Sequence, residues 1–189
     1  MSGVDRPGPR DGFDGPVWTW HPRHPTNGFW LRRMTHDLII HRFDAELIDA
    51  DGAAPPGELA GDLAADGIDD MLGTFLMFDR LAGAGESLQF TATDLGLGWH
   101  VVRTPGGPAW RDGAAPADVT VAAAARDLLL ILNRRLPAGA VTGDAAVLDR
   151  WREDSRFWIS GSHEPAAGDG PGHPLGRVVE REERPPPHA

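Results

Sequence analysis

One segment of the chain, residues 28–50, contains no proline and no internal glycine, although the 189 residues include 17 prolines and 24 glycines. Asn27 stands just before it and is a residue type that caps the N-terminus of helices well. Asp51-Gly52 follows as a stop signal. The segment therefore predicts one long helix, and such a helix must bury its apolar side against a partner.

That apolar side also carries two polar residues. At 100° per residue, a stripe along one side of the predicted helix consists of Trp30, Met34, Leu38, Ala45 and Ile48. Asp37 and His41 lie in the middle of this stripe, one turn apart, so both can point at one atom in a bundle interior. They could form a hydrogen-bonded ion pair at a helix–helix seam, or they could be two ligands of a divalent metal.

A metal site would need a further ligand. Catalytic zinc sites use three protein ligands and keep one position open, and in a chain without cysteine these must be His, Asp or Glu. His36 lies ~100° from Asp37 around the helix and is expected at the rim. The proline-rich residues 1–27 predict an extended lead-in, and its His21 and His24 could contribute only if it orders and folds back.

The periodicity changes after the long helix. Residues 58–82 predict two shorter helices that meet near Asp66-Gly67. Strands are expected at 87–94, 98–104, 108–113 and 117–123, and helices at 124–137 and 143–154. Because the strands are grouped rather than interleaved with helices, residues 55–154 predict an α+β domain, an antiparallel sheet with helices on one face. Residues 155–189 hold six prolines and five glycines and predict a disordered tail.

Composition narrows the functional classes. The formal net charge is −10, and the arginines form no positive stripe, so we expect no nucleic-acid binding. No apolar run approaches the ~20 residues of a membrane span, and the N-terminus lacks the apolar core of a signal peptide. A cytoplasmic protein without membrane contact is therefore expected.

Five segments, in this order, resemble one enzyme family. They are WLRRMTHDLIIHRFDAEL (30–47), ELAGDLAADGIDDML (58–72), LQFTATDLGLGWHV (88–101), DVTVAAAARDLLLILNRRLP (118–137) and VTGDAAVLDRW (141–151). Over residues 17–152 the chain is similar to the mycothiol-dependent maleylpyruvate isomerase family of actinobacteria. The resemblance implies the last helix of a DinB-like four-helix bundle, here within residues 28–52, followed by a domain of the sterol carrier protein type.

The resemblance also implies a metal site. The family's Glu and His ligands of a divalent metal, usually zinc, fall on Asp37 and His41 of this chain. The aspartate is one methylene shorter than the family's Glu. The family's third ligand, a His from preceding helices, has no counterpart here.

An arginine near the active site is a further implication. The family's arginine falls on Arg135, with Arg134 beside it. A guanidinium there could grip a dicarboxylate substrate bidentately, or both arginines could complement the carbonyl end of the helix at 124–136. Three other residues match the family pattern and are expected in a turn, in the core and at a helix N-cap: Asp94, Trp99 and Asp144.

Two functions follow. The first is the C-terminal portion of a mycothiol-dependent, divalent-metal isomerase or transferase that acts on a small electrophile such as maleylpyruvate. This truncated chain alone is then expected to be inactive, and the stripe of helix 28–50 is expected to bind a missing N-terminal helical fragment or a second copy of the chain. The alternative is a non-catalytic, sterol-carrier-like module that binds a small molecule or a protein.

Overall fold

The computed structural model describes residues 12–21, 24–49, 57–75 and 79–156. The chain divides into two compact units, residues 1–57 and 58–189. Within the described ranges, no helix is both long enough and apolar enough to cross a membrane.

The first unit contains α1 (Asn27–Asp49), which confirms the predicted long helix. The segment before α1 turns back on itself, because Pro16 and Thr26 form an isolated antiparallel bridge. Gly28 N, in the first turn of α1, donates a hydrogen bond of 2.7 Å to Phe13 O. Since the first N–H groups of a helix have no partner inside the helix, this contact stabilises the helix start.

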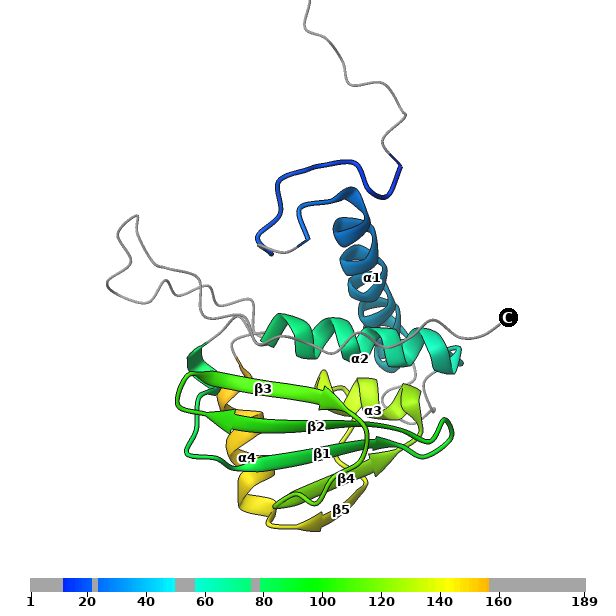
Figure 1. Cartoon of the computed structure of the whole chain (residues 1–189). Coiled ribbons are helices and arrows are strands. Elements are labelled where there is room, and N and C mark those ends of the chain that lie inside the picture. The colour runs from blue at the N-terminus through cyan, green and yellow to red at the C-terminus, as the bar shows by residue number, and fades with distance from the viewer. Residues whose placement is uncertain (1–11, 22–23, 50–56, 76–78, 157–189) are drawn as a thin grey trace, which may run out of the picture. The chain divides into compact units, whose positions relative to one another are not determined.

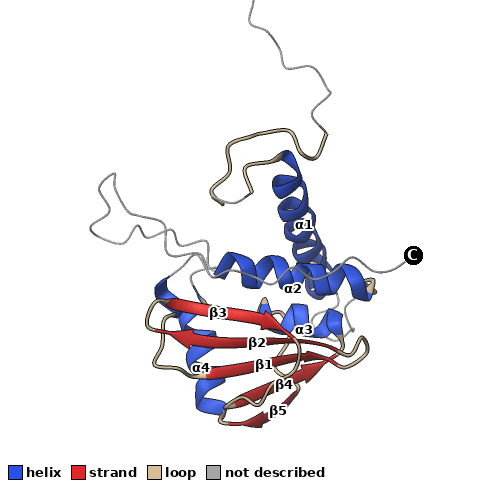
Figure 2. Cartoon of the chain, in the orientation of Figure 1, coloured by secondary structure: helices blue, strands red, loops and turns tan. Residues whose placement is uncertain are grey.

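The second unit is an α+β domain with a five-stranded sheet, which confirms the predicted fold class (Figure 1). Its elements are α2 (Gly61–Phe75), the short 3-10 helix η1 (Asp79–Leu81), β1 (Ser87–Ala92), β2 (Leu97–Thr104), β3 (Gly107–Asp112), β4 (Val119–Ala123), α3 (Ala125–Leu132), β5 (Ala140–Gly143) and α4 (Ala145–Asp154). In Figure 2, α3 and α4 lie behind the sheet, on one of its faces. This arrangement is compatible with the sterol-carrier-like sheet expected above.

The strand order is β3-β2-β1-β4-β5. Neighbouring strands pair antiparallel except β1 and β4, which are parallel. The sheet that was predicted to be antiparallel is therefore mixed. The parallel pair arises because the connection after β3 passes over β2 and β1 before β4 begins. The periodicity within single strands carries no information about such a connection, so the sequence analysis missed it.

The connection from β3 to β4, residues 113–118, is called the crossover here, and Figure 2 shows it in front of the sheet. Gln89 of β1 holds it at two points. Its Nε2 donates to Gly113 O at 3.3 Å, and its Oε1 accepts from Ala115 N at 3.0 Å. Gly98 of β2 leaves room for this contact, because a Cβ there would lie 2.7 Å from Gln89 Nε2.

Asp118 ends the crossover and ties it to the start of β1. Its Oδ2 accepts from Ser87 N at 2.7 Å and from Ser87 Oγ at 2.9 Å. The backbone hydrogen bond first, and the hydroxyl second, hold the pKa of Asp118 below its usual value. The crossover is thus attached to β1 at both ends: Gln89 of β1 binds its first residues, and its last residue, Asp118, binds Ser87 of β1.

The helices cover the face of the sheet opposite the crossover. Phe90 of β1 is fully buried, and its ring centroid lies 6.0 Å from that of Trp151 on α4. The Trp151 ring also contacts Phe75 of α2 edge-on, with centroids 5.7 Å apart. Aromatic pairs at this spacing contribute packing energy beyond their buried area, so this cluster joins α2, α4 and the sheet.

Arg103 of β2 is a buried cation, 4% exposed, on the same face. Its Nε donates to Leu81 O at 3.2 Å, its Nη2 donates to Ala82 O at 2.9 Å, and Nη2 also pairs with Asp154 of α4. Buried charges are tolerated when they are paired and hydrogen-bonded. Arg103 therefore fastens η1 and the end of α4 to β2.

Three boundaries differ from the sequence-based expectations. α2 runs without a break through Asp66-Gly67, because Gly67 is buried in the helix interior where packing outweighs its low helix propensity. α3 ends at Leu132 rather than near residue 137, and Arg134 after it has a left-handed φ of 64°. β5 was not predicted, because its four residues pair with β4 through a long-range contact.

Gly143 and Gly113 provide a matched test of the link between β5 and the crossover. Both have a left-handed φ, 95° and 101°, so alanine is strained at either position. A Cβ at Gly143 would also collide with Asp118 O, whereas a Cβ at Gly113 meets no atom within 4 Å. We expect Gly143→Ala to lower the free energy of unfolding by about 2 kcal/mol more than Gly113→Ala does, measured by urea denaturation. Equal losses would show that the strand can shift to accommodate the methyl group.

Candidate functional site

His41 of α1 lies between two carboxylates. Its Nε2 is 3.7 Å from Asp37 Oδ2, and its Nδ1 donates to Asp44 Oδ2 at 3.1 Å. The first distance is too long for a hydrogen bond, whereas the second is a normal one. The structure thus brings the two predicted metal ligands together at one-turn spacing, and the hydrogen bond of His41 goes to a third residue.

Asp44 was missed by the sequence analysis. The signal that could have found it is its position three residues after His41, which places both on the same side of a helix. Metal-binding histidines commonly donate their second ring N–H to a carboxylate, which fixes the tautomer and the ring orientation. With Nδ1 bound to Asp44, Nε2 is the ring nitrogen of His41 on the side of Asp37.

Most of the apolar stripe of α1 is exposed, whereas Trp30 is half-buried and its Nε1 donates to Trp18 O at 2.9 Å. The side chains of Met34, Leu38 and Ile48 are 43%, 69% and 76% exposed. The side chains of His41 and Asp37, between them, are 64% and 45% exposed. Large apolar side chains on one helix side, with a carboxylate and an imidazole among them, are typical of a helix that belongs to a bundle.

His21 and His24 do not reach this pair. Their ring centroids are 4.6 Å apart, and the His21 ring is 5.7 Å from the ring of Phe29 in the first turn of α1. Phe29 and His41 are separated by twelve residues, about 18 Å along a helix at ~1.5 Å per residue. Within the described ranges, no group of three or more His, Asp or Glu residues is placed to hold a metal ion.

The guanidinium groups of Arg134 and Arg135 contact backbone carbonyls at helix ends. Arg134 Nη1 donates to Arg152 O near the end of α4 at 2.7 Å, and Arg135 Nη1 donates to Asn133 O just after α3 at 2.7 Å. Burial first, then repulsion from Arg156 and Arg152, lower the pKa of Arg134. Only the contact of Arg135 is at the end of α3, where the structural alternative placed both arginines, whereas Arg134 contacts α4 instead. A catalytic role for Arg134 and Arg135 stays a prediction.

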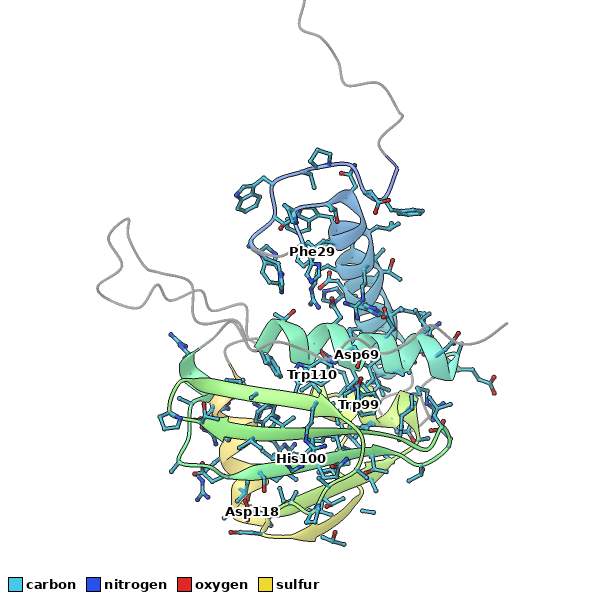
Figure 3. All side chains as sticks on the ribbon, viewed as in Figure 1. Phe29, Asp69, Trp99, His100, Trp110 and Asp118 are labelled. Atoms are coloured by element: carbon cyan, nitrogen blue, oxygen red, sulfur yellow. The ribbon has the colours of Figure 1, made fainter. Side chains whose placement is uncertain are left out.

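Asp94, Trp99 and Asp144 have the structural roles expected of them. Asp94, in the turn between β1 and β2, accepts from Ala125 N at the start of α3 at 2.9 Å. Trp99 is fully buried, and its Nε1 donates to Asp69 Oδ1 of α2 at 2.6 Å; Figure 3 labels both residues. Asp144 caps α4 by accepting from Ala146 N at 2.9 Å.

Comparison with known proteins gives likenesses over about half of the chain. No protein-family model matches it, and no curated protein matches it. Among solved structures, an inverting sec-alkylsulfatase from Pseudomonas sp. is 23% identical over 53% of this chain and 18% of that chain, with a TM-score of 0.41. UbiJ-SCP2, a ubiquinone synthesis protein, is 24% identical over 51% of this chain and 96% of that chain, with a TM-score of 0.36. Likenesses at this level support no inference about function.

Replacing Asp37 or His41 should hardly change stability. The two side chains are 45% and 64% exposed and their nearest polar atoms are 3.7 Å apart, and exposed contacts of this kind contribute ~0.5 kcal/mol or less. We therefore expect Asp37→Ala and His41→Ala to change the free energy of unfolding, measured by urea denaturation, by no more than this amount. A loss of ~2 kcal/mol in either variant would mean that the pair serves the fold rather than a ligand.

Proposed function

We propose that this chain is the C-terminal portion of a divalent-metal isomerase or transferase, in which α1 contributes Asp37 and His41 to a metal site of a helical bundle. The observation that carries the proposal is the orientation of His41. Its Nδ1 is engaged by Asp44 at 3.1 Å while its Nε2 lies 3.7 Å from Asp37 Oδ2, within an exposed apolar stripe. A histidine oriented by a carboxylate beside a second ligand type is the usual arrangement at protein metal sites.

The two residues fit part of a metal site and not the whole of one. A carboxylate and an imidazole are both ligand types that zinc accepts, and an open catalytic site needs three. Asp44 cannot be the third, because it is bound to the other ring nitrogen of His41. The third ligand in this proposal is a histidine from the other helices of the bundle, as in the family that the sequence resembles.

The proposed cofactors follow from the same resemblance. They are a divalent metal, zinc by family preference, and the thiol mycothiol, with a small electrophile of the maleylpyruvate type as substrate. When bound, such a metal supplies Lewis acidity, which lowers the pKa of a thiol that it coordinates. The residues of this chain would hold the ligand geometry. Asp44 would orient the His41 ring through Nδ1, and Asp37 would present its carboxylate one turn away.

A non-catalytic binding module is the second candidate. The observation that favours it is the fold of the second unit, a five-stranded α+β sheet compatible with the sterol carrier type. In that case the α+β domain would bind a small molecule or a protein without metal chemistry. The two experiments below separate the candidates.

Zinc binding by the full chain tests the metal proposal. We expect weak one-to-one binding in calorimetric titration that is lost in His41→Ala and in Asp37→Ala. Asp44→Ala should weaken it ~10-fold, because the orienting carboxylate is removed. His24→Ala is the matched control, since this exposed histidine lies in the same unit near the start of α1, and it should bind zinc as the wild type does. Equal binding by wild type and His41→Ala would contradict the proposal.

Activity tests the enzyme proposal. The chain, combined with a fragment that carries the family's N-terminal helices, should isomerise maleylpyruvate in the presence of mycothiol. His41→Ala should abolish this activity, and Arg135→Ala should reduce kcat/KM ~10-fold or more if its guanidinium grips the substrate carboxylate. Arg150→Ala, which removes an exposed arginine from α4, serves as the control. Metal binding without thiol chemistry on any electrophile would favour the binding module.

A further inference from the structure

A row of polar residues crosses the sheet on the face that carries the crossover, which is called the open face here. Backbone pairing places one residue of each strand in this row, and its members in strand order are Arg111, His100, Gln89, Thr120 and Thr142. Directly paired residues have Cβ atoms about 5 Å apart and point to the same side. The row is independent of α1 and of the metal proposal.

His100 is the buried member of the row that lacks a partner. It is 8% exposed, and its Nδ1 is buried without a hydrogen bond to any described residue. Its neighbour Gln89 cannot serve it, because the Gln89 amide already binds Gly113 O, Phe90 O and Ala115 N. Buried polar nitrogens in folded proteins nearly always have a partner, so this nitrogen points to a partner beyond the described residues.

The guanidinium group of Arg111, on the strand next to His100, is a second polar group without a partner among the described residues. It is exposed on the edge strand β3, directly opposite His100, and it makes no hydrogen bond or ion pair with the described residues. Burial first, and the charge of Arg111 second, lower the pKa of His100 and so favour its neutral imidazole. Asp118, the acidic residue of the crossover, is held by Ser87 and does not neutralise Arg111.

We propose that His100 and Arg111 together bind the oxyanionic group of a small molecule, a carboxylate or a phosphate, on the open face of the sheet. Arg111 provides the planar fork that matches such a group and brings the opposite charge. His100 provides a ring N–H, already desolvated and held between β1 and β3, that fixes where the oxyanion lies. Figure 3 labels His100 in the middle of the sheet, where the ligand would contact β2 and β3 beside the crossover.

Ring signals of His100 in nuclear magnetic resonance spectra of the full chain test this proposal. The His100 signals are identified by their absence in His100→Gln. Sodium acetate and sodium phosphate are titrated separately at pH 7, with sodium chloride adjusted to keep the ionic strength constant. We expect a saturable shift with at least one oxyanion, and the tighter of the two identifies the ligand class as a carboxylate or a phosphate.

Variants of the arginine complete the test. Arg111→Ala should raise the dissociation constant ~10-fold or more, because a charge-assisted hydrogen bond is lost, and Arg111→Gln should do the same while keeping a long polar side chain. Arg150→Ala removes an exposed arginine from α4 and should leave the constant unchanged. Shifts that do not saturate with either oxyanion, or equal constants in wild type and both Arg111 variants, would overturn the proposal. Neither result bears on zinc binding by Asp37 and His41.

Discussion

The arrangement of the sheet depends on the crossover, residues 113–118. Parallel neighbours such as β1 and β4 are usually joined by a connection of a dozen or more residues that often contains a helix. Here the connection from β1 to β4 contains β2 and β3, and its last part, the crossover, is too short to form a layer of its own. Its polar groups are instead satisfied on the sheet itself, by Gln89 in the middle and by the Asp118–Ser87 contacts at the end. The consequence is a sheet face that is partly covered without a helix.

Local sequence signals predicted much of the fold, because they act within a few residues. The absence of proline and glycine marked α1, two-residue alternation marked four strands, and the position of Asp144 marked the start of α4. The parallel pairing of β1 with β4 and the strand β5 depend on contacts between residues far apart in sequence, which no periodicity reports. The unbroken α2 shows the same effect, because burial of Gly67 outweighs a local break signal.

The candidate sites also differ in whether local spacing or long-range strand register brings their residues together. Helical spacing was sufficient to bring Asp37 and His41 together, since residues four apart are neighbours on any helix. The hydrogen bond between His41 and Asp44 could not be predicted from spacing alone, because it depends on the side-chain rotamers of both residues. The juxtaposition of His100 with Arg111 needed the register of β2 with β3, which is set by the turn between them and not by either residue.

The two outer strands show how the domain avoids sheet-to-sheet association. β3 contains Pro108, which has no N–H to offer to an incoming strand, and β5 has only four residues. Exposed strand edges with free N–H and C=O groups recruit other chains, and proline or a short length prevents such recruitment. Assembly of this chain through the apolar side of α1 is therefore not expected to extend its sheet at β3 or β5. Such an assembly should retain the circular dichroism of the separate molecules and should not bind amyloid dyes.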